Sequence, residues 1–189
     1  MTGEIDHPQP GGRAPAPGPL ALVQAFLNTH YDLGVDHGAE VWRSPEAYAA
    51  WLRTRGLLAN GTAVGPTELA RALRARGALR ELARGDDSAT KALTKAGEGA
   101  AVGVRFTPEG PAFAAADGSA QSALGLVLAL VAQAMIDGSW VRLKICPGRD
   151  CGWAFYDHSR NGSSRWCSMS ICGGREKARA HYRRTRGDD

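Results

Sequence analysis

The sequence predicts an α+β protein, in which a mostly helical N-terminal domain with one short β-hairpin precedes a small cysteine-rich module. Apolar residues recur at helical spacing in four segments before residue 140, and one further segment alternates apolar and polar residues as strands do. All four cysteines of the 189-residue chain lie between residues 146 and 172. The chain length fits one ordinary core with a small appendage.

Residues 1–19 form a Pro/Gly-rich segment that predicts a disordered tail. This segment lacks the basic start and the apolar stretch of a signal peptide. The most apolar segment, residues 123–136, is shorter than the roughly 20 residues of a membrane span. We therefore expect a cytoplasmic protein with no membrane partner.

The predicted N-terminal domain, residues 20–140, begins with a helix in the first part of segment 19–33. A second helix over 44–56 has Ser44 as its cap, Pro45 in its first turn and Gly56 as its stop. Leucines at a spacing near 3.6 predict a third helix over 66–85, with Gly77 as a candidate kink.

Residues 100–118 alternate in the manner of a hairpin, and a long apolar helix follows from Ser119 to about Asp137. The apolar side chains of this domain are expected only to fill its core; examples are Trp42, Trp51, Leu73 and Leu126. His30 and His37 lie near Asp32 and Asp36, but their spacing matches no pattern of metal ligands.

The cysteines form two pairs, each enclosing four residues, and fifteen residues separate the pairs. Two short-range pairs can supply four thiolates to a tetrahedral zinc ion with little loop closure within a pair. The predicted ligands of one structural zinc are Cys146, Cys151, Cys167 and Cys172. Two disulfides and an iron–sulfur cluster are the alternatives, and disulfides are disfavoured because they are rare in the cytoplasm.

Between the pairs, residues 153–157 alternate as a strand, Asn161-Gly162 predicts a tight turn, and residues 164–167 are expected to return as the second strand of a hairpin. A basic helix follows Cys172, so the second pair is expected at a helix start. A knuckle, a hairpin and a helix around one zinc ion make a treble-clef-like finger, predicted over residues 141–187.

Positive charge accumulates in this module. From Arg142 onward, eleven basic and five acidic residues give +6, whereas the preceding residues, with 12 basic and 14 acidic, give −2. At 100° per residue, four arginines share one face of the final helix, and two more flank the turn. The predicted nucleic-acid-binding residues are Arg160, Arg165, Arg175, Arg179, Arg183 and Arg186. Such guanidinium groups suit a row of DNA phosphates; a solvated helix with salt bridges is the alternative interpretation.

Residues 142–184 resemble the CGNR zinc finger, named for a Cys-Gly-Asn-Arg motif that follows Trp-Cys-Ser-Met. Here WCSM occupies 166–169 and CGGR occupies 172–175, so Gly174 stands where the family has Asn. The upstream part is similar to the ABATE domain, through AFLNT at 25–29, the helix around Trp51 and the leucine-rich helices. The resemblance implies a stress-induced transcription regulator that binds DNA through its finger.

These observations predict a zinc-finger DNA-binding regulator whose upstream domain senses a small-molecule effector or binds a protein. The alternative is a protein-interaction module, in which the zinc is structural and the arginines meet an acidic partner. An enzyme is not expected, because no nucleophile–base constellation occurs upstream and four protein ligands leave zinc no open position.

Overall fold

The computed structural model describes residues 9–31 and 39–186, and its helices and strands confirm the α+β class. The elements, in chain order, are η1 (Pro10–Gly12), α1 (Leu20–Leu27), β1 (His30–Tyr31), β2 (Ala39–Glu40), α2 (Pro45–Thr54), α3 (Pro66–Ala83), η2 (Asp87–Ala89), α4 (Thr90–Gly97), β3 (Val102–Thr107), β4 (Gly110–Ala115), α5 (Ala120–Ile136), η3 (Trp140–Arg142), β5 (Leu143–Ile145), β6 (Ala154–Tyr156), η4 (Met169–Gly173) and α6 (Gly174–Arg186). In the described part of the chain, the strands form antiparallel two-stranded sheets: β1–β2, β3–β4 and β5–β6.

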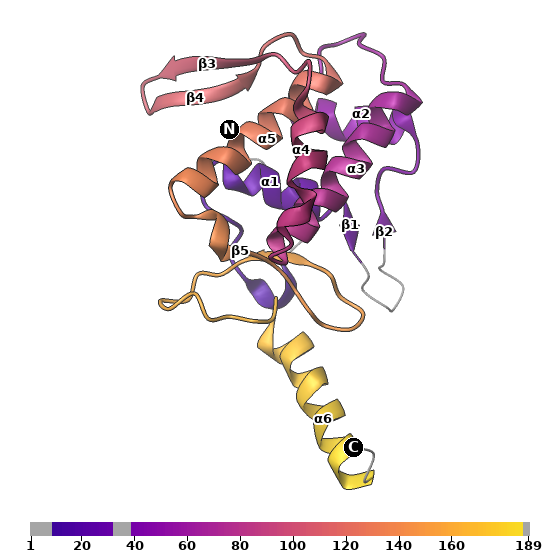
Figure 1. The fold of residues 1–189 in the computed structure, drawn as a ribbon, viewed down its shortest axis with the longest axis vertical. Coiled ribbons are helices and arrows are strands. Elements are labelled where there is room, and N and C mark those ends of the chain that lie inside the picture. Colours follow the sequence, from indigo (N-terminus) through magenta and orange to yellow (C-terminus); the bar gives the residue numbers. More distant parts are fainter. Residues whose placement is uncertain (1–8, 32–38, 187–189) are drawn as a thin grey trace.

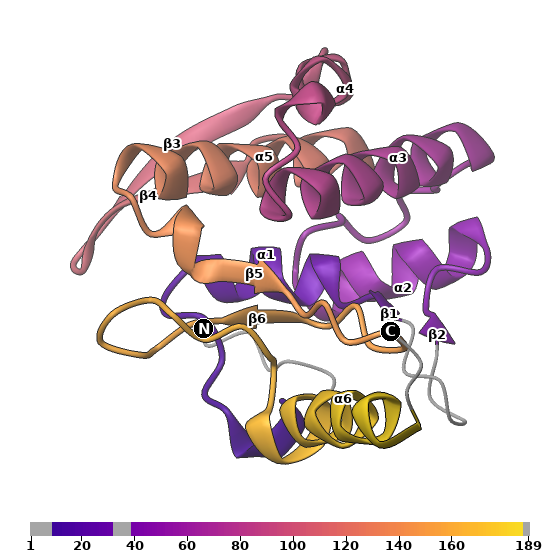
Figure 2. The ribbon, with the colours of Figure 1, turned by 60° about the horizontal axis from the view of Figure 1, so that its bottom comes forward.

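The helical domain has two layers. Figure 2 shows α3 and α5 side by side above α1 and α2, and α4 packs on the outer side of α3 and α5. The centre of the core is aromatic: Trp42 lies 5.0 Å from Phe26 and 5.3 Å from Trp51 between ring centroids. Trp42, Trp51 and Leu126 are buried as expected, and Leu73 is half-buried against the same core.

Local sequence signals set the helix ends. The Ser44 hydroxyl accepts a hydrogen bond from the Ala47 backbone N–H at 3.3 Å, and Ser119 accepts one from Ser122 at 3.1 Å, so both predicted caps are confirmed. Gly77 lies within α3 without ending it. The sequence did not predict α4 or the short β1–β2 pair.

The finger does not contain the predicted second strand over residues 164–167. The predicted strand is present as β6, but it pairs with β5, across the knuckle that carries the first two cysteines. Residues 164–167 use their backbone groups elsewhere: the Ser164 N–H donates to the Asp157 carboxylate, and the Trp166 carbonyl accepts from Arg13. The predicted turn is confirmed, because Gly162 has a φ of +60° and donates to the Ser159 carbonyl.

Residues 9–19 are not the predicted free tail, and residues 1–8 lie outside the described part. The Arg13 guanidinium donates to the carbonyls of Cys167 at 2.9 Å, Tyr156 at 3.2 Å and Trp166 at 3.2 Å. It also lies 4.9 Å from the Phe155 ring centroid. These carbonyls lack strand partners, so the arginine satisfies them and fixes the segment to the finger.

Among the described residues, no helix is both long and apolar enough to cross a membrane. The long apolar helix α5 has 17 residues and lies with α1, α3 and α4 in the helical domain. His37, Asp32 and Asp36 lie outside the described residues. His30 contacts Glu40, with 3.4 Å between its Nδ1 and the carboxylate.

Candidate metal centre and basic helix

The four cysteines converge from two parts of the finger. Cys146 follows β5 and Cys151 comes three residues before β6, so both belong to the knuckle. Cys167 precedes the single π turn of η4, and Cys172 lies within this turn just before α6. All four side chains are buried, and their Sγ atoms lie within 4.8 Å of one another.

The sulfur separations fit one tetrahedral ion. A Zn–S bond of about 2.3 Å places tetrahedral sulfurs about 3.8 Å apart. The Cys167 Sγ lies 3.6 Å from the Sγ atoms of Cys151 and Cys172. Disulfide sulfurs lie about 2.05 Å apart, so these cysteines are free thiols. A polynuclear iron–sulfur cluster would need room for further metal and sulfide atoms; four sulfurs this close hold one zinc ion, with no open position.

The protonation of the thiols is coupled. Hydrogen bonds from Cys151 and Cys167 favour the Cys146 thiolate and lower the pKa of Cys146 to about 2. The thiolate in turn raises the pKa of Cys151 to about 12, and it also raises the pKa of Cys167. Burial and the same negative charge raise the pKa of Cys172. A divalent cation would stabilise all four thiolates together, which is the electrostatic reason for a metal at this position.

Backbone contacts hold the two cysteine pairs. The Cys146 N–H donates to the Trp153 carbonyl at 2.8 Å, which closes the knuckle, and the Cys172 N–H donates to the Ser168 carbonyl at 3.0 Å. An added Cβ on Gly173 would lie 2.8 Å from the Met169 Sδ, so the exposed end of this methionine side chain would have to shift. Gly174, at the position where the family has Asn, leaves room for a side chain: its nearest neighbour would be the Met169 carbonyl at 3.5 Å.

A buried ion pair organises the loop between the two cysteine pairs. The Asp157 carboxylate is fully buried and accepts from Lys144 Nζ at 2.8 Å and from the N–H groups of Ser159 at 2.9 Å and Ser164 at 2.7 Å. Burial alone would raise the pKa of Asp157, but these hydrogen bonds outweigh it and hold the pKa well below its ordinary value. Asp157 is therefore an ionised anchor for the loop.

The finger is joined to the helical domain through polar contacts with buried partners. The Asn28 side chain of α1 donates to the Ala154 carbonyl at 2.9 Å and accepts from the Ala154 N–H at 2.7 Å. Arg80 of α3 donates to the Gly152 carbonyl at 2.6 Å, next to Cys151. Gln24 also donates to the Ala154 carbonyl at 3.0 Å. The zinc knuckle is thus fixed to α1 and α3.

The basic helix α6 extends away from the rest of the molecule (Figure 1). It carries six basic residues and one acidic residue between Gly174 and Arg186. Arg175 and Arg183 are exposed, and Arg186 lies over the Tyr182 ring at 4.5 Å from its centroid. Within the described part of the chain, none of these three arginines forms an ion pair.

Arg179 was predicted to contact nucleic acid, but in the structure its guanidinium is paired with carboxylates of the chain. Its guanidinium donates to the Glu176 carboxylate at 2.7 Å and to the Asp150 carboxylate at 3.2 Å. These bonds raise the pKa of Arg179. The alternative of a salt-bridged helix therefore holds for Arg179, because Asp150 of the knuckle lies against the helix from 29 residues away. Arg179 ties α6 to the knuckle.

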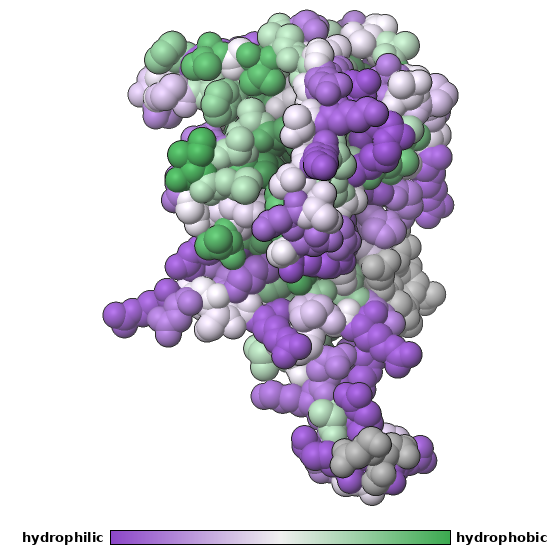
Figure 3. All heavy atoms as spheres, in the orientation of Figure 1, coloured by the Kyte–Doolittle hydropathy of each residue, from purple (hydrophilic) through white to green (hydrophobic). Residues whose placement is uncertain are grey.

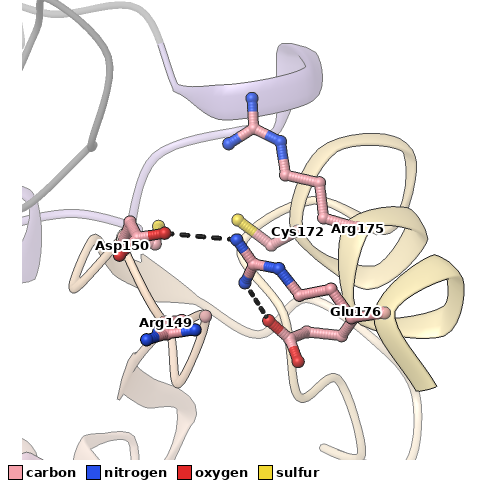
Figure 4. A pocket seen from close by; sticks show the side chains of 8 residues that line it. Arg149, Asp150, Cys172, Arg175 and Glu176 are labelled. Atoms are coloured by element: carbon pink, nitrogen blue, oxygen red, sulfur yellow. Dashed lines mark hydrogen bonds and ion pairs between the residues drawn. The ribbon is translucent and has the colours of Figure 1, made fainter. Parts of the chain in front are cut away.

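A shallow hollow beside the metal centre brings together three arginines. Figure 4 shows Arg149 and Asp150 of the knuckle opposite α6. The Arg175 side chain is directed away from the two hydrogen bonds that join Asp150 and Glu176 to the guanidinium between them. Arg149, Arg175 and Arg179 all line this hollow, next to Cys172. Arg149 was not among the predicted nucleic-acid-binding residues, although its position within the first cysteine pair, enclosed by metal ligands, is the signal that could have identified it.

Arg160 and Arg165 do not extend the α6 surface. Their loop leaves the finger in a direction different from that of α6 in both ribbon views (Figures 1 and 2). Arg165 lies over the Trp166 ring at 5.1 Å from its centroid, and Arg160 is exposed. The structure therefore separates the predicted arginines into two groups.

These features define a protein with a helical, partly β domain followed by a finger in which four cysteines hold one zinc ion. Residues 142–185 match the family described as "CGNR zinc finger". Residues 20–138 match the ABATE family, described as "Putative stress-induced transcription regulator". This second match covers more than half of the chain, so the chain belongs to that family, and both predicted resemblances are confirmed. Among proteins with curated functions, none is significantly similar to it.

Proposed function

We propose that the protein is a DNA-binding transcription regulator, in which zinc fixes α6 and the arginines of α6 contact DNA phosphates. The observation that carries this proposal is a set of exposed arginines on one face of α6 that have no carboxylate partner among the described residues: Arg175, Arg183 and Arg186. Arg149 adds a cation beside Arg175. Guanidinium groups without a carboxylate partner are available for phosphates, whereas Arg179 is held by Asp150 and Glu176.

The zinc has a structural role in this proposal. Four thiolates leave it no position for an activated water, which supports a regulator rather than a hydrolytic enzyme. The upstream domain is proposed as the sensor or interaction domain, and a cytoplasmic location is proposed with it. A protein-interaction role for the finger, with an acidic partner at α6, is the second candidate. On charge alone, the exposed arginines fit an acidic protein as well as they fit DNA.

A salt titration distinguishes phosphate contacts from an acidic protein partner. Three phosphate contacts predict that log affinity for duplex DNA falls with log salt concentration at a slope of about −2.7. The titration should use the zinc-loaded full chain, because the finger is fixed to α1 and α3. Failure to bind duplex DNA at about 50 mM salt would contradict the proposal.

Paired variants test the assignment to α6. The double change Arg183→Ala and Arg186→Ala should make the slope less steep by about 1.8, since it removes two phosphate contacts. Arg74→Ala with Arg105→Ala removes the same charge from exposed positions on α3 and β3, and it should leave the slope unchanged. An equal reduction of the slope in both double variants would mean that only net charge matters, and it would exclude α6 as the contact surface.

A further inference from the structure

The β3–β4 hairpin presents an apolar face to solvent. Its register pairs Val102 with Ala115, Val104 with Phe113, and Phe106 with Pro111. Directly opposed residues of an antiparallel pair point to the same face, so all six side chains share one face and none is charged. The alternating pattern that predicted the hairpin therefore places its apolar side on the surface: Phe106 is 86% exposed and Val104 is 56% exposed.

Among the described residues, the partner of this face within the chain lies at its base. At the base, an added Cβ on Gly125 of α5 would lie 2.4 Å from the Ala100 Cβ and 3.1 Å from Val102 Cγ2, so the hairpin and helix touch there. Ala115 packs against the core at the same level. Toward the tip the hairpin has no such cover. An isolated two-stranded hairpin is marginally stable in water, so this one lacks the packing that a hairpin of its length needs.

The surface continues along α5. At 100° per residue, Ala129, Ala132 and Ile136 lie within about 40° of Gly125 around the helix axis, so they face the same side as the hairpin contact. Ile136 is 88% exposed and Met135 beside it is 50% exposed. Figure 3 shows hydrophobic side chains over the hairpin and along the adjoining side of α5. We define the apolar face as Val102, Val104, Phe106, Phe113, Met135 and Ile136.

We propose that the apolar face is a homodimer interface, at which a second copy of this chain packs its own hairpin and α5. The six side chains expose on the order of 600 Å², at the upper end of what monomers leave in one patch. The adjoining exposed alanines and Pro111 bring this close to the about 800 Å² that each partner of a stable complex buries.

The chemistry of the face favours a second copy over a different protein. Interfaces of transient heteromeric complexes are about as polar as the remaining surface, whereas homodimer interfaces are more apolar. In this chain, with 22% charged residues, the face contains none. A face without charge cannot repel its own copy, and a two-fold axis brings the same patch of both copies together. The dimer does not depend on DNA binding, because the face lies on the ABATE domain and not on the finger.

Sedimentation equilibrium of the zinc-loaded full chain tests the dimer. We expect a mass of about 40 kDa at about 10 µM protein, twice the 20.0 kDa of one chain. The mass should persist in about 1 M NaCl, because apolar association is not screened by salt. A monomer at about 100 µM would overturn the proposal. So would a monomer that pellets with phosphatidylcholine vesicles, which would assign the face to a membrane surface.

Variants locate the interface. Phe106→Ser with Ile136→Ser should give a 20.0 kDa monomer at the same concentration, with unchanged circular dichroism and zinc content, since both side chains are exposed in the single chain. Arg105→Ser, on the opposite face of β3, should remain dimeric. A dimer that survives Phe106→Ser with Ile136→Ser, or that Arg105→Ser abolishes as well, would overturn the assignment to this face.

Discussion

Asp157 shows how one side chain controls the geometry of the finger. Its carboxylate binds Lys144 from β5 and two backbone N–H groups of the following loop. The Lys144 ammonium in turn donates to the carbonyls of Gly162 at 2.5 Å and Ser164 at 3.1 Å. A buried charge is stable only with such partners. The pair therefore sets the path of the chain between the two cysteine pairs.

Asp157→Asn should lower the free energy of unfolding by about 2 kcal/mol at pH 7, because it leaves Lys144 without its counter-ion and one N–H without an acceptor. Urea denaturation measures this difference. The folded-state pKa of Asp157 is depressed, so its contribution is complete above the ordinary carboxyl pKa of about 4 and is lost as the pH falls below it. The gap between the wild type and the variant should then narrow in acid.

Asp150→Asn is the matched control. Its carboxylate also meets a basic side chain, Arg179, but both side chains are exposed, 50% and 41% respectively. Exposed pairs contribute little, so this change should alter stability by less than about 0.5 kcal/mol. Equal effects of the two substitutions would refute the role given to Asp157.

At the scale of residues, the sequence predicted what depends on short-range spacing. The four zinc ligands could be identified because each pair encloses only four residues. The partners of Arg179 and Arg13 could not be predicted, since Asp150 lies 29 residues from Arg179 and the Cys167 carbonyl lies 154 residues from Arg13. Such contacts depend on how distant elements pack, which periodicity does not encode.

Among the elements, capped and strongly periodic helices were predicted well, whereas strand pairing was not. β6 was recognisable from its alternating residues, but its partner was misassigned, because the Asn161-Gly162 turn indicated a hairpin on the wrong side. The turn exists; Lys144 and Asp157 stabilise it in place of a second strand. α4 is amphipathic but only eight residues long, with Ala96 as its single buried side chain, so its pattern spans barely two turns and was missed.

Two helical glycines should respond to alanine in opposite directions. Gly77 is exposed within α3 and an added Cβ would meet nothing within 4 Å, so Gly77→Ala should stabilise the protein by about 0.5–1 kcal/mol through helix propensity. At Gly125 the added Cβ would clash with Ala100 at the base of the hairpin. Gly125→Ala should therefore destabilise by about 1–3 kcal/mol. Thermal or urea unfolding measures both, and a shift of the same sign would contradict the packing of β3 on α5.

At the scale of the whole molecule, the finger and the helical domain are connected on two sides. Asn28 and Arg80 fix the knuckle from the helical domain, and Arg13 fixes the opposite pair of cysteines from the N-terminal segment. The direction of α6 is therefore set by the metal centre together with these contacts. The sequence predicted both parts in the correct order, but it could not predict the contacts between them, since these contacts join residues that are distant in sequence.

The position of the basic helix depends on one zinc ion held by four cysteine sulfurs. Zinc K-edge X-ray absorption of the full-length protein measures the ligands directly. We expect one zinc per chain with four sulfur neighbours at about 2.3 Å. Nitrogen or oxygen in the first shell, or fewer than four sulfurs, would contradict the closed structural site and the position that it gives to the basic helix.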